Sequence, residues 1–134
     1  MAQVAVLDCG ADATKPMVVR YFDGDGPKPV SGQAVAFKSL AKPESGKELS
    51  CRKPQGVFVF QFKPVPFNPT LQGMCAGNVT GELVVLHKGR EVLPRTLFED
   101  PTACFDTRAE SRRVRSITLD PAGGKPVIDQ AAAR

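Results

Sequence analysis

Hydrophobic and polar residues alternate with a period of two along much of this chain, which is the pattern of β-strands. The clearest example is VFVFQF, residues 57–62. Its three phenylalanines (Phe58, Phe60, Phe62) fall on one face, and two valines and a glutamine fall on the other. Because both faces carry apolar residues, we expect this strand to lie centrally, with packing on both sides.

Six other segments combine β-branched or aromatic residues with flanking turn residues, and we expect strands at 4–9, 16–22, 33–40, 79–88, 91–99 and 114–119. The segment 64–70 is dense in proline and predicts an extended crossing segment rather than a paired strand. Helical signals are scarce. Thr107 and Glu110 have the spacing of a capping box, which predicts one short helical turn near 107–113.

A chain of 134 residues fits one domain with a core of its own. Turn residues recur about every ten positions, as in all-β folds with many short strands. We therefore predict an all-β, single-domain β-sandwich, immunoglobulin-like or related, of about seven to nine strands over residues 1–120. Residues 121–134 combine Pro, Gly and small side chains, so we expect a flexible C-terminal tail.

The four cysteines are an even set, spread widely through the chain: Cys9, Cys51, Cys75 and Cys104. Zinc sites use closely spaced ligand pairs, and this sequence has neither a C-x-x-C pair nor more than one histidine. Four independent free thiols remain an alternative, but two disulfides explain the even count more simply. Disulfides predict an oxidising compartment.

A hairpin over HKGREV predicts how the cysteines pair. With Gly89 and Arg90 as central residues, Lys88 pairs with Glu91 and Leu86 with Leu93. Extended in that register, the arms bring Cys75 toward Cys104 and leave Cys9 to pair with Cys51. One β-bulge would shift this register.

The charge balance limits the partner classes. A net charge of +4 and a pI near 9.0 favour anionic surfaces but do not predict specific nucleic-acid binding. No apolar run is long enough to span a membrane. The first residues lack the features of a secretory signal, so we expect the signal of an exported protein to be absent from this sequence. Residue usage (fifteen valines against two isoleucines) suggests a GC-rich bacterial gene, and the expected location is periplasmic or secreted.

The densest positive charge lies at Arg108, Arg112, Arg113 and Arg115, which we name the arginine cluster. Guanidinium groups bind phosphate, sulfate or carboxylate bidentately, so the cluster is our candidate anion-binding site. The alternative is a solvated edge that discourages aggregation, and nearby Asp106 and Glu110 favour that alternative by diluting the field.

Other chemistry is sparse. Asp23 and Asp25 resemble the start of a calcium loop, but the further oxygen ligands are missing, so we expect no metal and no cofactor. His87, brought by folding to Asp100 or Asp106, could serve a small hydrolase. None of the familiar nucleophile, metalloprotease or phosphate-binding motifs occurs in the sequence.

We expect a non-catalytic, exported binding or protein-interaction module: an envelope accessory, an inhibitor or a surface-exposed factor. Its partner would be an unidentified protein or an anionic surface, and the chain itself would be a monomer. The alternatives are a small hydrolase with a His/carboxylate site and a carrier of an anionic glycan or lipid headgroup. The sequence favours a non-catalytic protein over an enzyme and leaves that question open.

Overall fold

A computed structural model describes residues 3–23, 32–37, 47–66, 79–99 and 112–132. This part of the chain is all-β and contains nine strands and no helix. The strands are β1 (Gln3–Asp8), β2 (Met17–Asp23), β3 (Gln33–Phe37), β4 (Lys47–Lys53), β5 (Gly56–Pro66), β6 (Val79–His87), β7 (Arg90–Leu97), β8 (Arg112–Leu119) and β9 (Val127–Ala132).

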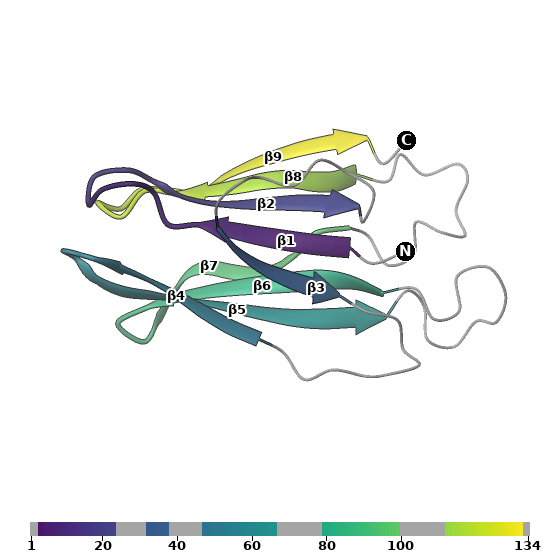
Figure 1. Cartoon of the computed structure of the whole chain (residues 1–134), viewed down its shortest axis with the longest axis horizontal. Coiled ribbons are helices and arrows are strands. Elements are labelled where there is room, and N and C mark those ends of the chain that lie inside the picture. Colours follow the sequence, from purple (N-terminus) through teal and green to yellow (C-terminus); the bar gives the residue numbers. More distant parts are fainter. Residues whose placement is uncertain (1–2, 24–31, 38–46, 67–78, 100–111, 133–134) are drawn as a thin grey trace, which may run out of the picture.

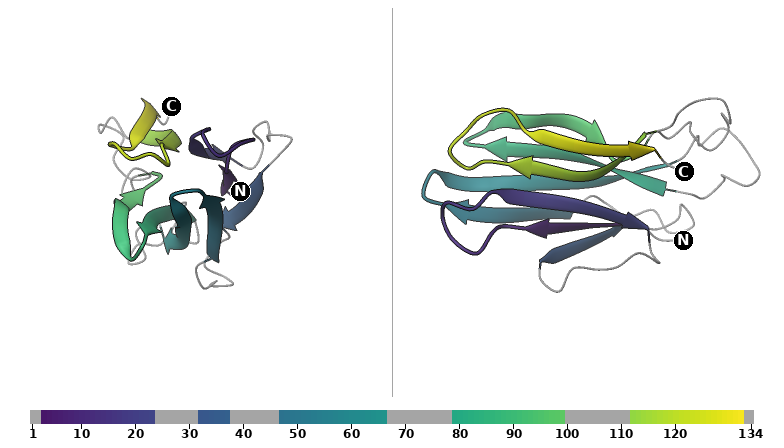
Figure 2. Two further views of the ribbon diagram at one scale, coloured as in Figure 1. Left: turned by 90° about the vertical axis from the view of Figure 1, so that its left-hand side faces the viewer. Right: turned by 90° about the horizontal axis from the view of Figure 1, so that it is seen from above.

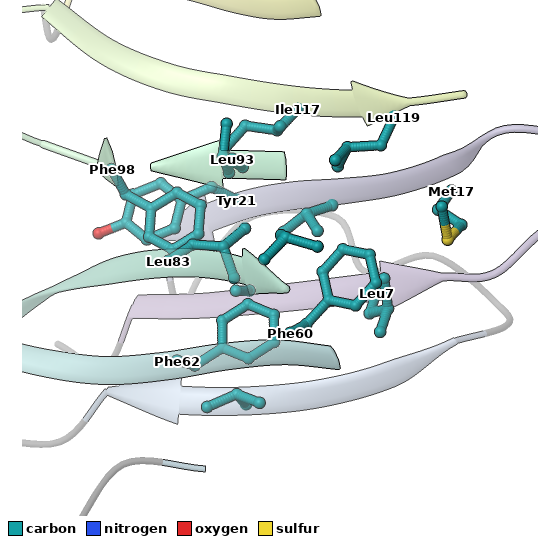
Figure 3. Close-up of a cluster of buried hydrophobic side chains, with 14 of the residues drawn as sticks. Leu7, Met17, Tyr21, Phe60, Phe62, Leu83, Leu93, Phe98, Ile117 and Leu119 are labelled. Carbon is teal, nitrogen blue, oxygen red and sulfur yellow. The ribbon is translucent and has the colours of Figure 1, made fainter. Parts of the chain in front are cut away.

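The strands form two antiparallel sheets that lie over one another as two layers (Figures 1 and 2). The five-stranded sheet has the order β3-β1-β2-β8-β9, and the four-stranded sheet has the order β4-β5-β6-β7. One hydrophobic core, with residues from both sheets, fills the space between them (Figure 3). The all-β prediction is confirmed for the described residues.

The phenylalanines of β5 belong to this core. Phe58, Phe60 and Phe62 are 3%, 0% and 1% exposed. The expectation of packing on both faces is wrong, because Val57 on the opposite face is 43% exposed and Gln61 is also exposed. β5 is central only within its own sheet, between β4 and β6.

Gly81 of β6 allows the two sheets to approach closely. A Cβ at this position would lie 2.2 Å from Cζ of Phe37 on β3, so any side chain would displace that ring. Nearby, the hydroxyls of Tyr21 and Thr80 are 3.1 Å apart and share a hydrogen bond inside the core. The Tyr21 ring also stacks on Phe98, with centroids 4.7 Å apart. A polar pair can be buried here because each hydroxyl supplies a partner for the other.

The C-terminal segment differs from the predicted tail. Val127–Ala132 form β9, which pairs with β8 from Thr118↔Val127 to Arg112↔Ala132. The sequence does not indicate this strand clearly, because residues 127–130 are exposed and an edge strand can be held by backbone hydrogen bonds with little burial.

The predicted helical turn near 107–113 needs a correction at its end, because Arg112 and Arg113 are extended in β8. Its other residues lie outside the described ranges.

The β6–β7 hairpin has a different turn from the one predicted. Lys88 and Gly89 are its central residues, with φ of 53° and 77°, and His87 pairs with Arg90. Positive φ at both central residues matches the twist of the flanking strands. Two register shifts, on either side of Val85, then move the far arms to Leu83↔Thr96 and Glu82↔Leu97. The predicted Lys88–Glu91 and Leu86–Leu93 pairs are therefore wrong.

The proline-rich end of β5 is also paired. Pro64 and Pro66 lie opposite Gly81 and Val79 of β6, so part of the expected crossing segment is a strand. The described pairing of β5 with β4 ends at Phe62↔Lys47. Beyond that point β5 has one described neighbour, and a proline that lacks an N–H is tolerated at such an edge.

The predicted Cys9–Cys51 disulfide is present, and it joins the two sheets. Cys9 follows β1 of the five-stranded sheet, and Cys51 lies in β4 of the four-stranded sheet, with Cα atoms 5.5 Å apart. Cys51 is 1% exposed and packs in the core. The expected Cys75–Cys104 disulfide lies outside the described residues.

Candidate functional site

Four strand connections gather at one end of the molecule, on the left of Figure 1: β1–β2, β4–β5, β6–β7 and β8–β9. The last three surround a half-open pocket of about 410 Å³, which we name the hairpin-end pocket. Small-molecule and side-chain binding sites usually lie in hollows of this size. The pocket is therefore the candidate site of the described structure.

The floor of the hairpin-end pocket is apolar. Phe58 and Leu119 are 3% and 4% exposed, Pro121 is buried, and Val92 is partly buried against the core. Each comes from a strand or turn fixed by the sheets, so the floor is an extension of the core to the surface. Ala122, Gly123 and Gly124 complete the wall, and a Cβ at either glycine would meet no atom within 4 Å.

His87 lies beside this floor. Its ring stacks on Phe58, with centroids 4.1 Å apart and 8° between the planes. Its Nε2 is 2.8 Å from the carbonyl oxygen of Gln55, and because a carbonyl only accepts hydrogen bonds, Nε2 carries the proton and donates it. Nε2 is therefore committed to holding the β4–β5 turn and is not a free base.

Gly56 makes this contact possible. Its φ is +127°, and a Cβ there would lie 3.1 Å from Nε2 of His87. Glycine at this turn position thus serves both the backbone conformation and the approach of the imidazole.

The rim of the pocket carries opposite charges. Lys88 projects from the β6–β7 turn, and Asp120 begins the β8–β9 connection; both are exposed. Asp120 also organises its own turn, since its Oδ1 accepts from the Ala122 N–H at 2.9 Å and its carbonyl accepts from the Gly123 N–H at 3.0 Å. An apolar floor with a cation and an anion at its rim suits a group that is apolar at its tip and polar where it leaves the pocket.

The β1–β2 connection is fixed beside this end by Asp12. Its Oδ1 accepts from the Thr14 N–H at 2.8 Å, the Thr14 hydroxyl at 2.7 Å and the Lys15 N–H at 3.1 Å. Hydrogen bonds from Thr14 hold the pKa of Asp12 below its ordinary value, with smaller contributions from Lys15 and from the charge of Lys53. The Lys53 ammonium, 7% exposed, donates to the Asp12 carbonyl at 2.8 Å and so links this connection to β4.

The arginine cluster is only partly described. Arg112, Arg113 and Arg115 lie in β8, and Arg108 lies outside the described residues. The register shift between Val114 and Ser116 falls at Arg115, so the regular alternation of faces along β8 is interrupted there. Arg115 Nε is 3.5 Å from Asp129 Oδ2 of β9, and both side chains are more than half exposed. The cluster is separate from the hairpin-end pocket and remains a predicted anion site.

The other predicted groups do not meet in the described structure. Asp100 and Asp106, proposed partners of His87, lie outside the described ranges, as does Asp25. The carboxylate that shares the pocket with His87 is Asp120 instead. Within the described residues, no group of three or more His, Cys, Asp or Glu side chains is placed to hold a metal ion.

Comparisons with known proteins give no relative: no family model, curated protein or solved structure matches this chain. None of the described residues forms a helix with the length and apolar character needed to cross a membrane. The structure therefore defines the protein as an all-β chain of two antiparallel sheets joined by a disulfide.

Sequence reasoning missed most of the pocket. The β8–β9 wall falls mostly in the segment predicted as a tail, although D-P-A-G-G at 120–124 between two apolar runs is a turn signal. No local sequence pattern predicts that Phe58 stacks on His87 or that the Gln55 carbonyl accepts its hydrogen bond. Both contacts depend on how the connections meet in space.

Proposed function

We propose that this chain is a non-catalytic, exported binding or protein-interaction module with an immunoglobulin-like or related β-sandwich fold. Two antiparallel sheets around one core support the sandwich assignment, and the Cys9–Cys51 disulfide supports export to an oxidising compartment, periplasmic or extracellular. An envelope accessory, an inhibitor and a surface-exposed factor all fit this description.

The observation that carries the proposal is the hairpin-end pocket. Its apolar floor of Phe58, Val92, Leu119 and Pro121 would accept one apolar side chain of a partner protein. Lys88 and Asp120 at the rim would then contact the polar backbone or charged neighbours of that side chain. His87 acts here as a structural group, because its Nε2–H is donated to the Gln55 carbonyl.

Filling the pocket tests this proposal. Ala122 is exposed on the pocket wall, so Ala122→Trp should occupy the hollow and leave the fold intact. Ala34, exposed on β3 and absent from the pocket lining, provides the matched control Ala34→Trp. The immobilised proteins would be compared for capture from a bacterial envelope fraction.

The expected result is a partner that is retained by the wild type and Ala34→Trp but lost with Ala122→Trp. The same captured proteins with all three would contradict a role for the pocket. Thermal unfolding of each variant would separate loss of binding from loss of structure.

A small hydrolase is the second candidate, because His87 and Asp120 line the same pocket. In this case Nδ1 of His87, the ring nitrogen not donated to Gln55, would be the base. Hydrolysis of a simple activated ester that disappears in both His87→Ala and Asp120→Asn would favour the enzyme. Equal rates of ester hydrolysis in the wild type, His87→Ala and Asp120→Asn would argue against the hydrolase and favour the non-catalytic binding module.

A further inference from the structure

The four sheet edges of the described structure are not equally protected against pairing with another strand. β4 carries charged residues along its length, among them Lys47, Glu48 and Arg52. β7 carries Pro94 and Arg95, and it has one extra residue relative to β6 at each of the two register shifts between them. Charges, proline and bulges are the usual means by which natural edges avoid association. Both edges of the four-stranded sheet are therefore protected.

The edges of the five-stranded sheet have fewer of these features, and the register shift in the pairing of β9 with β8 falls at Arg115 of β8 rather than in β9 itself. Neither β3 (QAVAF) nor β9 (VIDQAA) contains proline or a basic residue, and the single charge is Asp129. In β3 the large apolar side chains, Val35 and Phe37, are each 2% exposed and belong to the core. β9 is different, because Val127 and Ile128 are 64% and 39% exposed. Two of the three exposed large hydrophobic residues in the described chain are thus consecutive on one edge strand, one on each face of the sheet.

Ile128 is exposed although it faces the core side of its sheet. It pairs with Ile117 of β8, which is 0% exposed, so both face the core side of the sheet. The core covers Ile117 of β8 but not Ile128 of β9. β9 is the outermost strand of its sheet in Figure 1. The Asp129 carboxylate is already paired with Arg115 on the neighbouring strand. Among the described strands none pairs with the outer edge of β9, which presents a backbone ladder, the apolar side chains of Val127 and Ile128, and an Asp129 carboxylate paired with Arg115.

We propose that the occupant of this edge is a second copy of the chain, joined by antiparallel β9–β9 pairing into a sheet of ten strands. A twofold axis perpendicular to the sheet keeps both core faces on the same side and makes one residue of β9 face itself. Placing the axis at Asp129 would oppose two carboxylates, which is unfavourable. Placing it at Ile128 would leave a short ladder, because Pro126 lacks an N–H.

An axis at Gln130 avoids both problems. Ile128 then pairs with residue 132 of the second copy and Asp129 with residue 131, and both of those are alanines. Large residues face small ones, and no like charges meet. This pairing extends beyond the proposed function, does not use the hairpin-end pocket, and revises the expectation of a monomer.

Sedimentation equilibrium over a range of concentrations tests the inference. The wild type should show a monomer–dimer equilibrium, and Ile128→Lys, which adds a charge at the edge, should be monomeric at the same concentrations. Val57→Lys is the matched control, because Val57 is 43% exposed but lies on the outer face of the internal strand β5. It should dimerise like the wild type.

Cysteine cross-linking tests the register. Gln130→Cys places a thiol opposite its own copy, so mild oxidation should give a 130–130 bridge that peptide mapping identifies. Asp129→Cys, one position away, should cross-link much less. A wild type that stays monomeric at every concentration, or dimers lost equally in Val57→Lys and Ile128→Lys, would overturn the proposal. Equal cross-linking through positions 129 and 130 would overturn it too.

Discussion

At the scale of single residues, alternation separates the two faces of β5. The phenylalanines at 58, 60 and 62 are all buried, and the residues between them face outward. The sequence predicts the periodicity correctly but not the environment of the second face, because Val57 and Val59 look like core residues until the position of the other sheet is known. Val57 shows that an apolar residue on a strand need not be buried.

The Phe60 ring should be the largest single contribution of β5 to stability. It is 0% exposed and central to the core, so Phe60→Ala should lower the free energy of unfolding by about 3–5 kcal/mol through lost burial and the cavity left behind. Val57→Ala on the exposed face should change it by less than about 0.5 kcal/mol. Chemical denaturation of both variants gives the comparison, and similar small effects would mean that Phe60 is not packed as described.

At the scale of elements, the sequence contains no clear signal for two strands, β4 and β9. In β4 the inward positions are Leu49, Cys51 and Lys53, and the lysine breaks the apolar pattern although it is 7% exposed. The burial of this lysine is compensated by the hydrogen bond that its ammonium donates to the Asp12 carbonyl, in a connection 41 residues away. In β9 the apolar side chains of Val127 and Ile128 are exposed, so they do not mark a buried face. No local pattern contains either piece of information.

The β1–β2 connection should contribute to acid sensitivity through Asp12. Its pKa is lowered in the folded state, so the ionised form stabilises the fold. That contribution is complete above the unfolded value of about 3.9 and is lost as pH falls through the lower folded pKa. Asp12→Asn should therefore be less stable than the wild type near neutral pH, with the difference shrinking below about pH 4.

Thr14→Val provides the control for this prediction, because the Thr14 hydroxyl is the largest cause of the shift. An NMR titration should show the Asp12 pKa rising in that variant. A stability difference between Asp12→Asn and the wild type that does not change with pH would show that the carboxylate charge is unimportant.

At the scale of the whole molecule, the candidate site is made by connections that the sequence keeps far apart. Gln55, His87 and Asp120 come from three hairpins, and they meet only because all three turns reach the same end of the sheets. A correct list of strands would not give this pocket without the order of the strands and the register of each hairpin. Two register shifts in β6–β7 show how easily the register departs from a regular count.

The Cys9–Cys51 disulfide should be a major part of global stability. Closing a loop with a sequence separation of 42 contributes roughly 4 kcal/mol in the chain-entropy account. In a Cys75→Ser/Cys104→Ser background, only this disulfide can be reduced, so the unfolding free energies of the oxidised and reduced forms give its contribution directly. Equal values for the two forms would show that packing alone holds the sheets together.

The same covalent ring limits how the chain can respond to force. A pull on the two ends would be carried from residue 9 to residue 51 through sulfur, so β2 and β3 would bear no tension and could not be drawn out. Stretching the oxidised protein should release roughly 140 Å less chain than stretching the reduced one, since each residue spans at most about 3.3–3.6 Å. Tension would pass from β1 through the disulfide into the end of β4 and then along the strands that follow it, β5 to β9.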